Sequence, residues 1–293
     1  MQDFLDIFDI YLLEAVINGI LLGGLLALLA VGLNLIFGVI DVTWICYAEL
    51  VMVGMYGMYY LVSAFHVSYW LAAPLCILLV AGMGALLHVL VIQPLLSAPP
   101  INQLLATGGV LFFLQSLATV LFGIDFRNIG IQLPVLAVGE MHFSYARLLA
   151  FGAALVAMVA VYVFMTRTYT GTAIRAIAQD RQIMALMGVD ARRIYIVTSA
   201  LGGALAGLAS CLLVLQYDVH PFVGLSFGPI TFLICVLGGL GNFVGGFVAA
   251  FLFAEIISLG GLFADLEWGY VLAFGFFILM MFVRPAGLLA RRS

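Results

Sequence analysis

The chain has 293 residues, of which 66% are hydrophobic and only 8% are charged, and its formal net charge at pH 7 is −4. Soluble domains carry about a quarter of charged residues, so this composition excludes a soluble domain and predicts an integral membrane protein. All of the basic side chains are arginines, since the sequence contains no lysine. The absence of lysine also excludes a P-loop and Schiff-base chemistry in this chain.

Apolar segments long enough to cross a bilayer follow one another along the chain, as windows of about 20 residues show. In chain order they are residues 14–38, 44–63, 69–92, 104–123, 147–165, 194–216, 227–240, 245–262 and 268–283. The segment 227–240 is short, which also fits a broken or re-entrant helix. We therefore predict an all-α, polytopic transmembrane helical bundle with eight or nine spans, and treat residues 1–293 as a single transmembrane domain.

The distribution of arginine predicts the orientation in the membrane. Half of the arginines lie in residues 167–193, and Arg284, Arg291 and Arg292 lie near the C-terminus. Loops rich in arginine stay on the cytoplasmic side. Counting spans from these loops places the C-terminus in the cytoplasm and the N-terminus and residues 125–145 outside. The first 126 residues contain no lysine or arginine, so their orientation is inherited from the rest.

The basic segment 167–193 is predicted to form short helices around a tight turn. Asp180 and Asp190 are suited to cap helix N-termini, and Gly188 suits the left-handed position that follows a helix. Three apolar side chains share one face of the middle helix, at i, i+3 and i+4: Ile183, Leu186 and Met187. Such a face favours either a groove on a soluble partner or the lipid interface, where arginines would hold it.

Polar and amphipathic residues inside apolar spans mark candidate solute paths, because a polar side chain costs free energy in hydrocarbon. The candidates are Asn34, Trp44, Tyr47, Glu49, Gln115 and Asn242. Glu49 has an alternative interpretation, in which it only caps or packs at the membrane interface. The glycine-rich run at 238–246 predicts an interrupted helix at the membrane edge. We find no catalytic constellation and no metal-ligand spacing among the cysteines and histidines, so the sequence predicts neither an enzyme nor a metal site.

The basic segment carries a resemblance to a known family. Its sequence GTAIRAIAQDRQIMALMGVDARR resembles the cytoplasmic coupling loop of permease subunits of branched-chain amino acid ABC importers. That family shows Gly-x-Ala-x-Arg-Ala-x-Ala-x-Asp, then Ala-x-x-(Met/Leu)-Gly-(Ile/Val) and a following arginine. The matching residues are Gly171, Ala173, Arg175, Ala176, Ala178, Asp180, Ala185, Met187, Gly188, Val189 and Arg193. Residues 94–118, 236–255 and 284–289 are similar to three further blocks of the family.

This resemblance implies that the chain is a membrane subunit of an ATP-driven importer of the bacterial inner membrane and catalyses no reaction itself. It would form the translocation path for branched-chain amino acids or a related small polar solute. The resemblance also implies two cytoplasmic ABC ATPase subunits, a second permease chain that is related or identical, and an extracytoplasmic substrate-binding protein. The lipid bilayer surrounds the chain, and no nucleic acid is involved. ATP is bound by the partner subunits, so the chain itself needs no cofactor. The residues implied in coupling to the ATPase are Arg175, Asp180, Ala185, Leu186, Met187, Gly188 and Arg193.

One stretch departs from the family pattern. Where the family usually has Gly-x-Ile-Asn-Phe-Ala-His-Gly-Glu, this chain has DVTWICYAE at residues 41–49, so that Trp44, Tyr47 and Ala48 replace Asn, His and Gly while Glu49 is kept. If this stretch lines the path, urea, short amides or nucleobases are alternative solutes. The alternative class is a proton-coupled secondary transporter with Glu49 or Glu255 as the relay.

Overall fold

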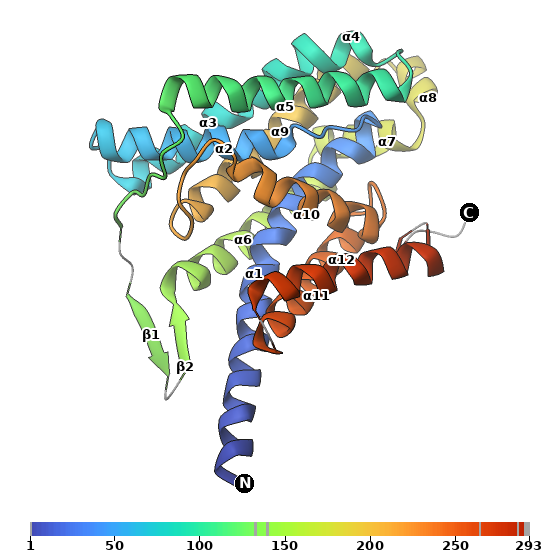
Figure 1. The fold of residues 1–293 in the computed structure, drawn as a ribbon. Helices are drawn as coiled ribbons and strands as arrows, with labels where there is room; N and C mark the ends of the chain where they lie inside the picture. Colours follow the sequence, from blue (N-terminus) through green and yellow to red (C-terminus); the bar gives the residue numbers. More distant parts are fainter. Residues whose placement is uncertain (1, 132–133, 139–140, 264, 286, 290–293) are drawn as a thin grey trace.

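The computed structural model describes residues 2–131, 134–138, 141–263, 265–285 and 287–289, and most of them are helical (Figure 1). Six helices in this part of the chain are long and apolar enough to cross a membrane. They are α1 (Gln2–Ile40), α3 (Tyr69–Leu87), α5 (Pro100–Phe122), α6 (Tyr145–Arg167), α9 (Ala191–Leu213) and α11 (Phe243–Phe263). The protein is therefore a multi-pass helical membrane protein, as the composition predicted.

Shorter helices lie between these. The apolar ones are α2 (Tyr47–Tyr59), α10 (Val223–Gly238) and α12 (Leu266–Val283). The remaining short ones are α4 (Gln93–Leu95), α7 (Tyr169–Gln179) and α8 (Arg181–Leu186). Two π-helical turns, Tyr60–Ala64 and His88–Ile92, continue α2 and α3. Each predicted apolar segment coincides largely with one of the long or apolar helices.

A short hairpin departs from the predicted all-α fold. Strand β1 (Val135–Val138) pairs antiparallel with β2 (Met141–Ser144), in the register Val135 opposite Ser144. The sequence predicts an external loop at residues 125–145. A strand of four residues is too short to be distinguished from a loop by an alternating pattern. The hairpin forms because its two strands pair with each other.

The core of the bundle surrounds α1. This helix packs against α6, α9, α10 and α11, and Leu28, Ala30 and Ile36 in its second half are completely buried. In Figure 1 α1 runs through the middle of the molecule from the N-terminus, with the hairpin on one side and α7 and α8 on the other. The second half of α1 is covered on nearly all sides and reads as continuously apolar, which explains why it shows no amphipathic pattern.

Close contact between helices depends on glycine. In α3 and α9, Gly84 and Gly203 face one another so closely that added Cβ atoms would meet backbone. A Cβ on Gly84 would lie 2.6 Å from the carbonyl oxygen of Ser199, and one on Gly203 would lie 2.7 Å from that of Val80. Lipid provides no hydrophobic drive for helix association, so small residues at the contact are what allow van der Waals packing.

We predict that Gly84→Val destabilises the protein by about 1–3 kcal/mol more than Gly82→Val, because the larger side chain forces α3 and α9 apart. Gly82 is a matched control on the same helix, since nothing lies within 4 Å of a Cβ built there. Thermal unfolding of the purified protein in detergent measures the difference. Equal melting temperatures for the two variants would contradict the role of this contact.

Candidate functional site

The basic segment begins with a helix that is fixed to the bundle. Thr168 caps α7, since the backbone N–H of Gly171 donates to its Oγ1 at 3.0 Å. The inner face of α7 is buried through Ala173, Ile174 and Ile177. A Cβ on Gly171 would lie 2.3 Å from the carbonyl oxygen of Phe164 in α6, so glycine is required for this approach. Because α7 is held this closely, α8 starts from a defined position.

Helix α8 has the caps that the sequence predicted. The backbone N–H of Ile183 donates to Oδ1 of Asp180 at 2.9 Å, which is an N-cap bond. Gly188 follows the helix with φ +81°, in the left-handed region that favours glycine. The N–H groups of Met187 and Val189 each donate at 3.1 Å, to the carbonyls of Ile183 and Met184. These bonds satisfy the end of the helix and fix its direction.

The outward face of α8 is apolar. Ile183, Leu186 and Met187 expose 57%, 88% and 75% of their surface, whereas Met184 is partly buried against the core. The side chain of Ala185 lies outside the described part of the structure. Exposed apolar side chains beside a polar, arginine-rich surface, to which Arg175 on α7 also contributes, are typical of an interaction site.

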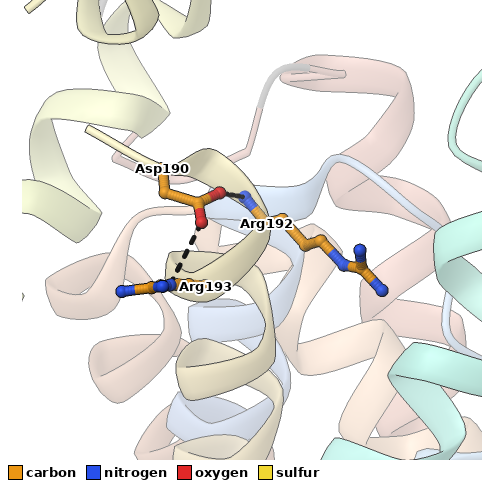
Figure 2. Close-up of polar contacts among 3 residues, drawn as sticks. All are labelled: Asp190, Arg192 and Arg193. Atoms are coloured by element: carbon orange, nitrogen blue, oxygen red, sulfur yellow. Dashed lines mark hydrogen bonds and ion pairs between the residues drawn. The ribbon is translucent and has the colours of Figure 1, made fainter. Parts of the chain in front are cut away.

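Asp190 organises the start of α9, directly after this turn (Figure 2). Its Oδ1 accepts from the backbone N–H of Arg192 at 3.0 Å, and its Oδ2 lies 3.2 Å from Nε of Arg193. Both side chains of the ion pair are largely exposed, so the pair contributes about 0–1 kcal/mol to stability. Its effect is to orient the guanidinium group of Arg193 at the end of the segment.

A second site lies inside the bundle and contains a buried carboxylate. Glu49, in the first turn of α2, is completely buried. Its Oε1 accepts from Nε2 of Gln115 in α5 at 3.0 Å, while its Oε2 has no hydrogen-bond partner within the described residues. The helix N-terminus stabilises a carboxylate there by about 0.3–1 kcal/mol, whereas the desolvation of a buried ion costs several kcal/mol. The surrounding protein therefore offsets only part of the free-energy cost of burying the charged carboxylate of Glu49.

The carboxylate borders a cavity of about 280 Å³. Its wall is mostly apolar and comes from α1, α2, α5, α10 and the segment before α2. Trp44 and Tyr47 belong to this wall, but their polar atoms are engaged elsewhere. The indole Nε1 of Trp44 donates to Sγ of Cys46 at 2.7 Å, and the Tyr47 hydroxyl donates to the carbonyl of Gly202 at 3.3 Å. Four of the six predicted path residues thus meet at one place.

The other two predicted path residues, Asn34 and Asn242, lie together at a different place. The side-chain Oδ1 of Asn34 accepts from the N–H of Gly241 at 3.2 Å, and the Asn242 side chain donates to the carbonyl of Leu289 at 2.8 Å. Gly239 and Gly241 have φ of +97° and +77° between α10 and α11, so the predicted interruption of the helix is confirmed. Oδ1 of Asn242 also accepts from the backbone N–H of Gly245 at 3.0 Å, so both asparagines satisfy backbone groups of that interruption.

Sequence reasoning missed the contribution of α10 to the cavity. Gly224 and Gly228 lie on its inner face, and a Cβ on Gly224 would lie 2.5 Å from Oε1 of Glu49. The signal was present as two small residues four positions apart, the spacing at which helices approach closely. The sequence does not reveal that the partner at this spacing is a carboxylate.

Comparisons with known proteins agree on one family. The family model described as branched-chain amino acid transport system, permease component, matches residues 15–281. The high-affinity branched-chain amino acid transport system permease protein BraD of Pseudomonas aeruginosa is 28% identical, over 95% of this chain and 96% of its own length. The corresponding protein LivH of Escherichia coli is 26% identical, over 96% of each chain. A probable LivH of the archaeon Methanocaldococcus jannaschii is 24% identical, over 79% of this chain and 76% of its own.

We predict that Gln115→Leu lowers the free energy of unfolding by about 1–3 kcal/mol, because it removes the donor of a buried carboxylate. The double variant Glu49→Leu/Gln115→Leu should recover most of this loss, since it leaves no buried charge. A double-mutant cycle of thermal unfolding in detergent gives the coupling between the two residues. Simple additivity of the two single variants would show that the hydrogen bond contributes nothing.

Proposed function

The chain belongs to the family of permease components of branched-chain amino acid transport systems, and on this premise we propose that it is the membrane subunit of an ATP-driven ABC importer of the bacterial inner membrane. As a member of this family it is a transport subunit and not an enzyme. The proposed solutes are branched-chain amino acids or a related small polar molecule. The observation that carries the proposal is the exposed apolar face of α8 within the segment that resembles the family's coupling loop.

Two cytoplasmic ATPase subunits are the proposed partners of α8. They bind ATP, so the chain itself needs no cofactor. The apolar residues Ile183, Leu186 and Met187 would enter a groove of the ATPase, with Arg175 and Arg193 at its edge. A second permease chain, related or identical, and an extracytoplasmic substrate-binding protein complete the assembly. The rigid attachment of α7 to α6 supports this role, because a docking helix transmits force only if its base is fixed.

The proposed topology has eight or nine spans, and nine of them place the N-terminus outside and the C-terminus in the cytoplasm. Contacts along α1 support it. In the first half of α1, Asn18 accepts from Arg147 at 2.9 Å, close to the hairpin in sequence. Towards its other end, Val31 lines one cavity together with Met165, near the end of α6 and just before the basic segment, and Phe243, the first residue of α11. The residues after α12 reach the same end, since the N–H of Leu288 donates to the carbonyl of Leu237 at 2.7 Å.

Other solutes are the second candidate, because the stretch 41–49 departs from the family pattern and forms part of the wall of the internal cavity. Trp44 and Tyr47 give this wall flat aromatic surfaces, which suit urea, short amides or nucleobases as well as an aliphatic side chain. The path proposed for the solute runs past Trp44, Tyr47, Glu49 and Gln115.

We predict that a cysteine at Thr170 reacts with an impermeant maleimide in inverted membrane vesicles and not in intact cells, whereas one at Asp125 reacts in intact cells. The four native cysteines are all buried and give little background. The expectation follows from the arginine distribution, which keeps residues 167–193 in the cytoplasm. Labelling of Thr170→Cys from outside would show that the proposed orientation in the membrane is inverted.

We predict that Leu186→Asp and Met187→Asp lower ATP-dependent uptake about tenfold or more in reconstituted vesicles, because they place a charge in the apolar contact with the ATPase. Gly188→Val should act in the same direction, through about 1–2 kcal/mol of strain in the left-handed position. Gln179→Asp, at an exposed position of α7, is the matched control and should retain uptake.

Uptake and co-purification of the ATPase should fall together, while the permease still inserts into the membrane. Normal uptake by Leu186→Asp would show that α8 does not dock the ATPase. Uptake that continues with an ATPase unable to hydrolyse ATP, and that follows an imposed pH gradient, would replace the proposal by the proton-coupled alternative with Glu49 or Glu255 as the relay.

A further inference from the structure

Arg127, in the segment that follows α5, is a cation held in place by neutral groups. Its Nη1 donates to the Tyr60 hydroxyl at 2.8 Å, and its Nη2 donates to the carbonyl of Phe122 at 2.5 Å. Among the described residues neither Asp125, Asp218 nor any other carboxylate forms an ion pair with it. These contacts fix the direction of the guanidinium group and leave several of its N–H donors for a ligand.

A lateral groove of about 280 Å³, separate from the internal cavity, begins beside this cation. Its walls come from α2, α3 and α5, and they include Tyr60 and Phe122, the two residues that accept from Arg127. The rest of the lining is mostly apolar, and Leu79 of α3 and Leu117 of α5 are exposed. Only 28% of the apolar stretch of each of these two helices is buried inside the protein. The groove therefore opens on the side of the bundle, at the depth of the membrane.

One further polar group lies inside the lateral groove. The side chain of Tyr56 is buried and lines the groove, and its hydroxyl has no hydrogen-bond partner within the described residues. Tyr56 precedes Tyr60 by one turn, which separates the two residues by about 6 Å along the helix axis. A buried hydroxyl without a partner costs free energy, so the occupant of the groove should supply an acceptor at this level.

We propose that the lateral groove binds an anionic phospholipid, whose phosphate lies on Arg127 and whose ester carbonyl accepts from the Tyr56 hydroxyl. One acyl chain then lies against Leu79, Met83 and Leu117. A guanidinium group forms charge-assisted hydrogen bonds with phosphate, and basic pockets between membrane helices suit anionic headgroups. A helix of a second permease chain fits less well, because its backbone acceptors are already engaged within the helix and offer nothing to the two donors.

The test uses the purified permease in detergent and two lipids with identical chains, dioleoyl phosphatidylglycerol and dioleoyl phosphatidylcholine. Native mass spectrometry counts the lipid that stays bound over a titration. The wild-type protein should bind phosphatidylglycerol about tenfold or more tightly, because choline offsets the charge of the phosphate. Arg127→Gln should lose this preference, since the amide carries no charge. Tyr56→Phe should weaken both lipids by about threefold to tenfold and keep the preference, because it removes only the donor to the ester.

Two variants serve as controls. Arg147→Gln removes an arginine that lines a different pocket, and Gly152→Leu adds a side chain where nothing lies within 4 Å of the Cβ. Both should bind the two lipids as the wild-type protein does. Gly57→Leu instead fills the lateral groove from a position where a Cβ makes only an ordinary contact at 3.8 Å, and it should abolish binding of both lipids. If Arg127→Gln does not fold, Gly57→Leu and the wild-type preference carry the test.

Equal affinity of the wild-type protein for the two lipids overturns the proposal. Retention of the preference by Arg127→Gln overturns it as well, because another cation would then hold the headgroup. Unchanged lipid binding by Gly57→Leu, together with a changed oligomeric state, assigns the groove to contact with a second copy of the chain and also overturns it. Since the measurement uses neither an ATPase nor a transported solute, these outcomes leave the proposed function untouched.

Discussion

The close approach of helix backbones at glycine is the constraint on which the rest of the structure depends. Apolar side chains gain little by leaving lipid for protein, so tight packing has to hold the helices together. Gly84 and Gly203 join α3 to α9, and a Cβ on Gly245 would lie 1.9 Å from the carbonyl oxygen of Gly238 where α10 turns into α11. Replacing any of these glycines moves a whole helix, because backbone cannot yield as a flexible side chain does.

The same closeness determines where polar groups lie. The short helix α2 begins inside the bundle, after a non-helical segment in which Asp41 has φ +56°. Its first turn therefore places Glu49 against Gly224 of α10. The side chain of Glu49 is completely buried there. A carboxylate in such a place is costly, and only a ligand, a proton or a strong donor set compensates for the cost.

Local features of this fold could be predicted from the sequence, and pairings between distant segments could not. Long apolar runs indicated the helices, and the caps at Asp180, Gly188 and Asp190 followed from residue types that favour those positions. The six polar residues chosen for a path shared only their depth in apolar segments. Their division into a Glu49–Gln115 site and an Asn34–Asn242 site depends on contacts across 66 and 208 positions of sequence, which no local pattern encodes.

Helix α9 connects the two sites on which the functional proposals rest. It begins at the Asp190 cap, directly after the exposed turn of α8, and reaches Gly202, whose carbonyl accepts from the Tyr47 hydroxyl at 3.3 Å. Tyr47 stands two residues before Glu49 on α2. Gly32 and Gly202 keep α1 and α9 in contact at this level, where a Cβ on Gly32 would meet the Tyr47 hydroxyl. Since packed interfaces of this kind shift as units and do not deform continuously, we expect a movement of α8 that displaces α9 to displace α2 and the carboxylate with it.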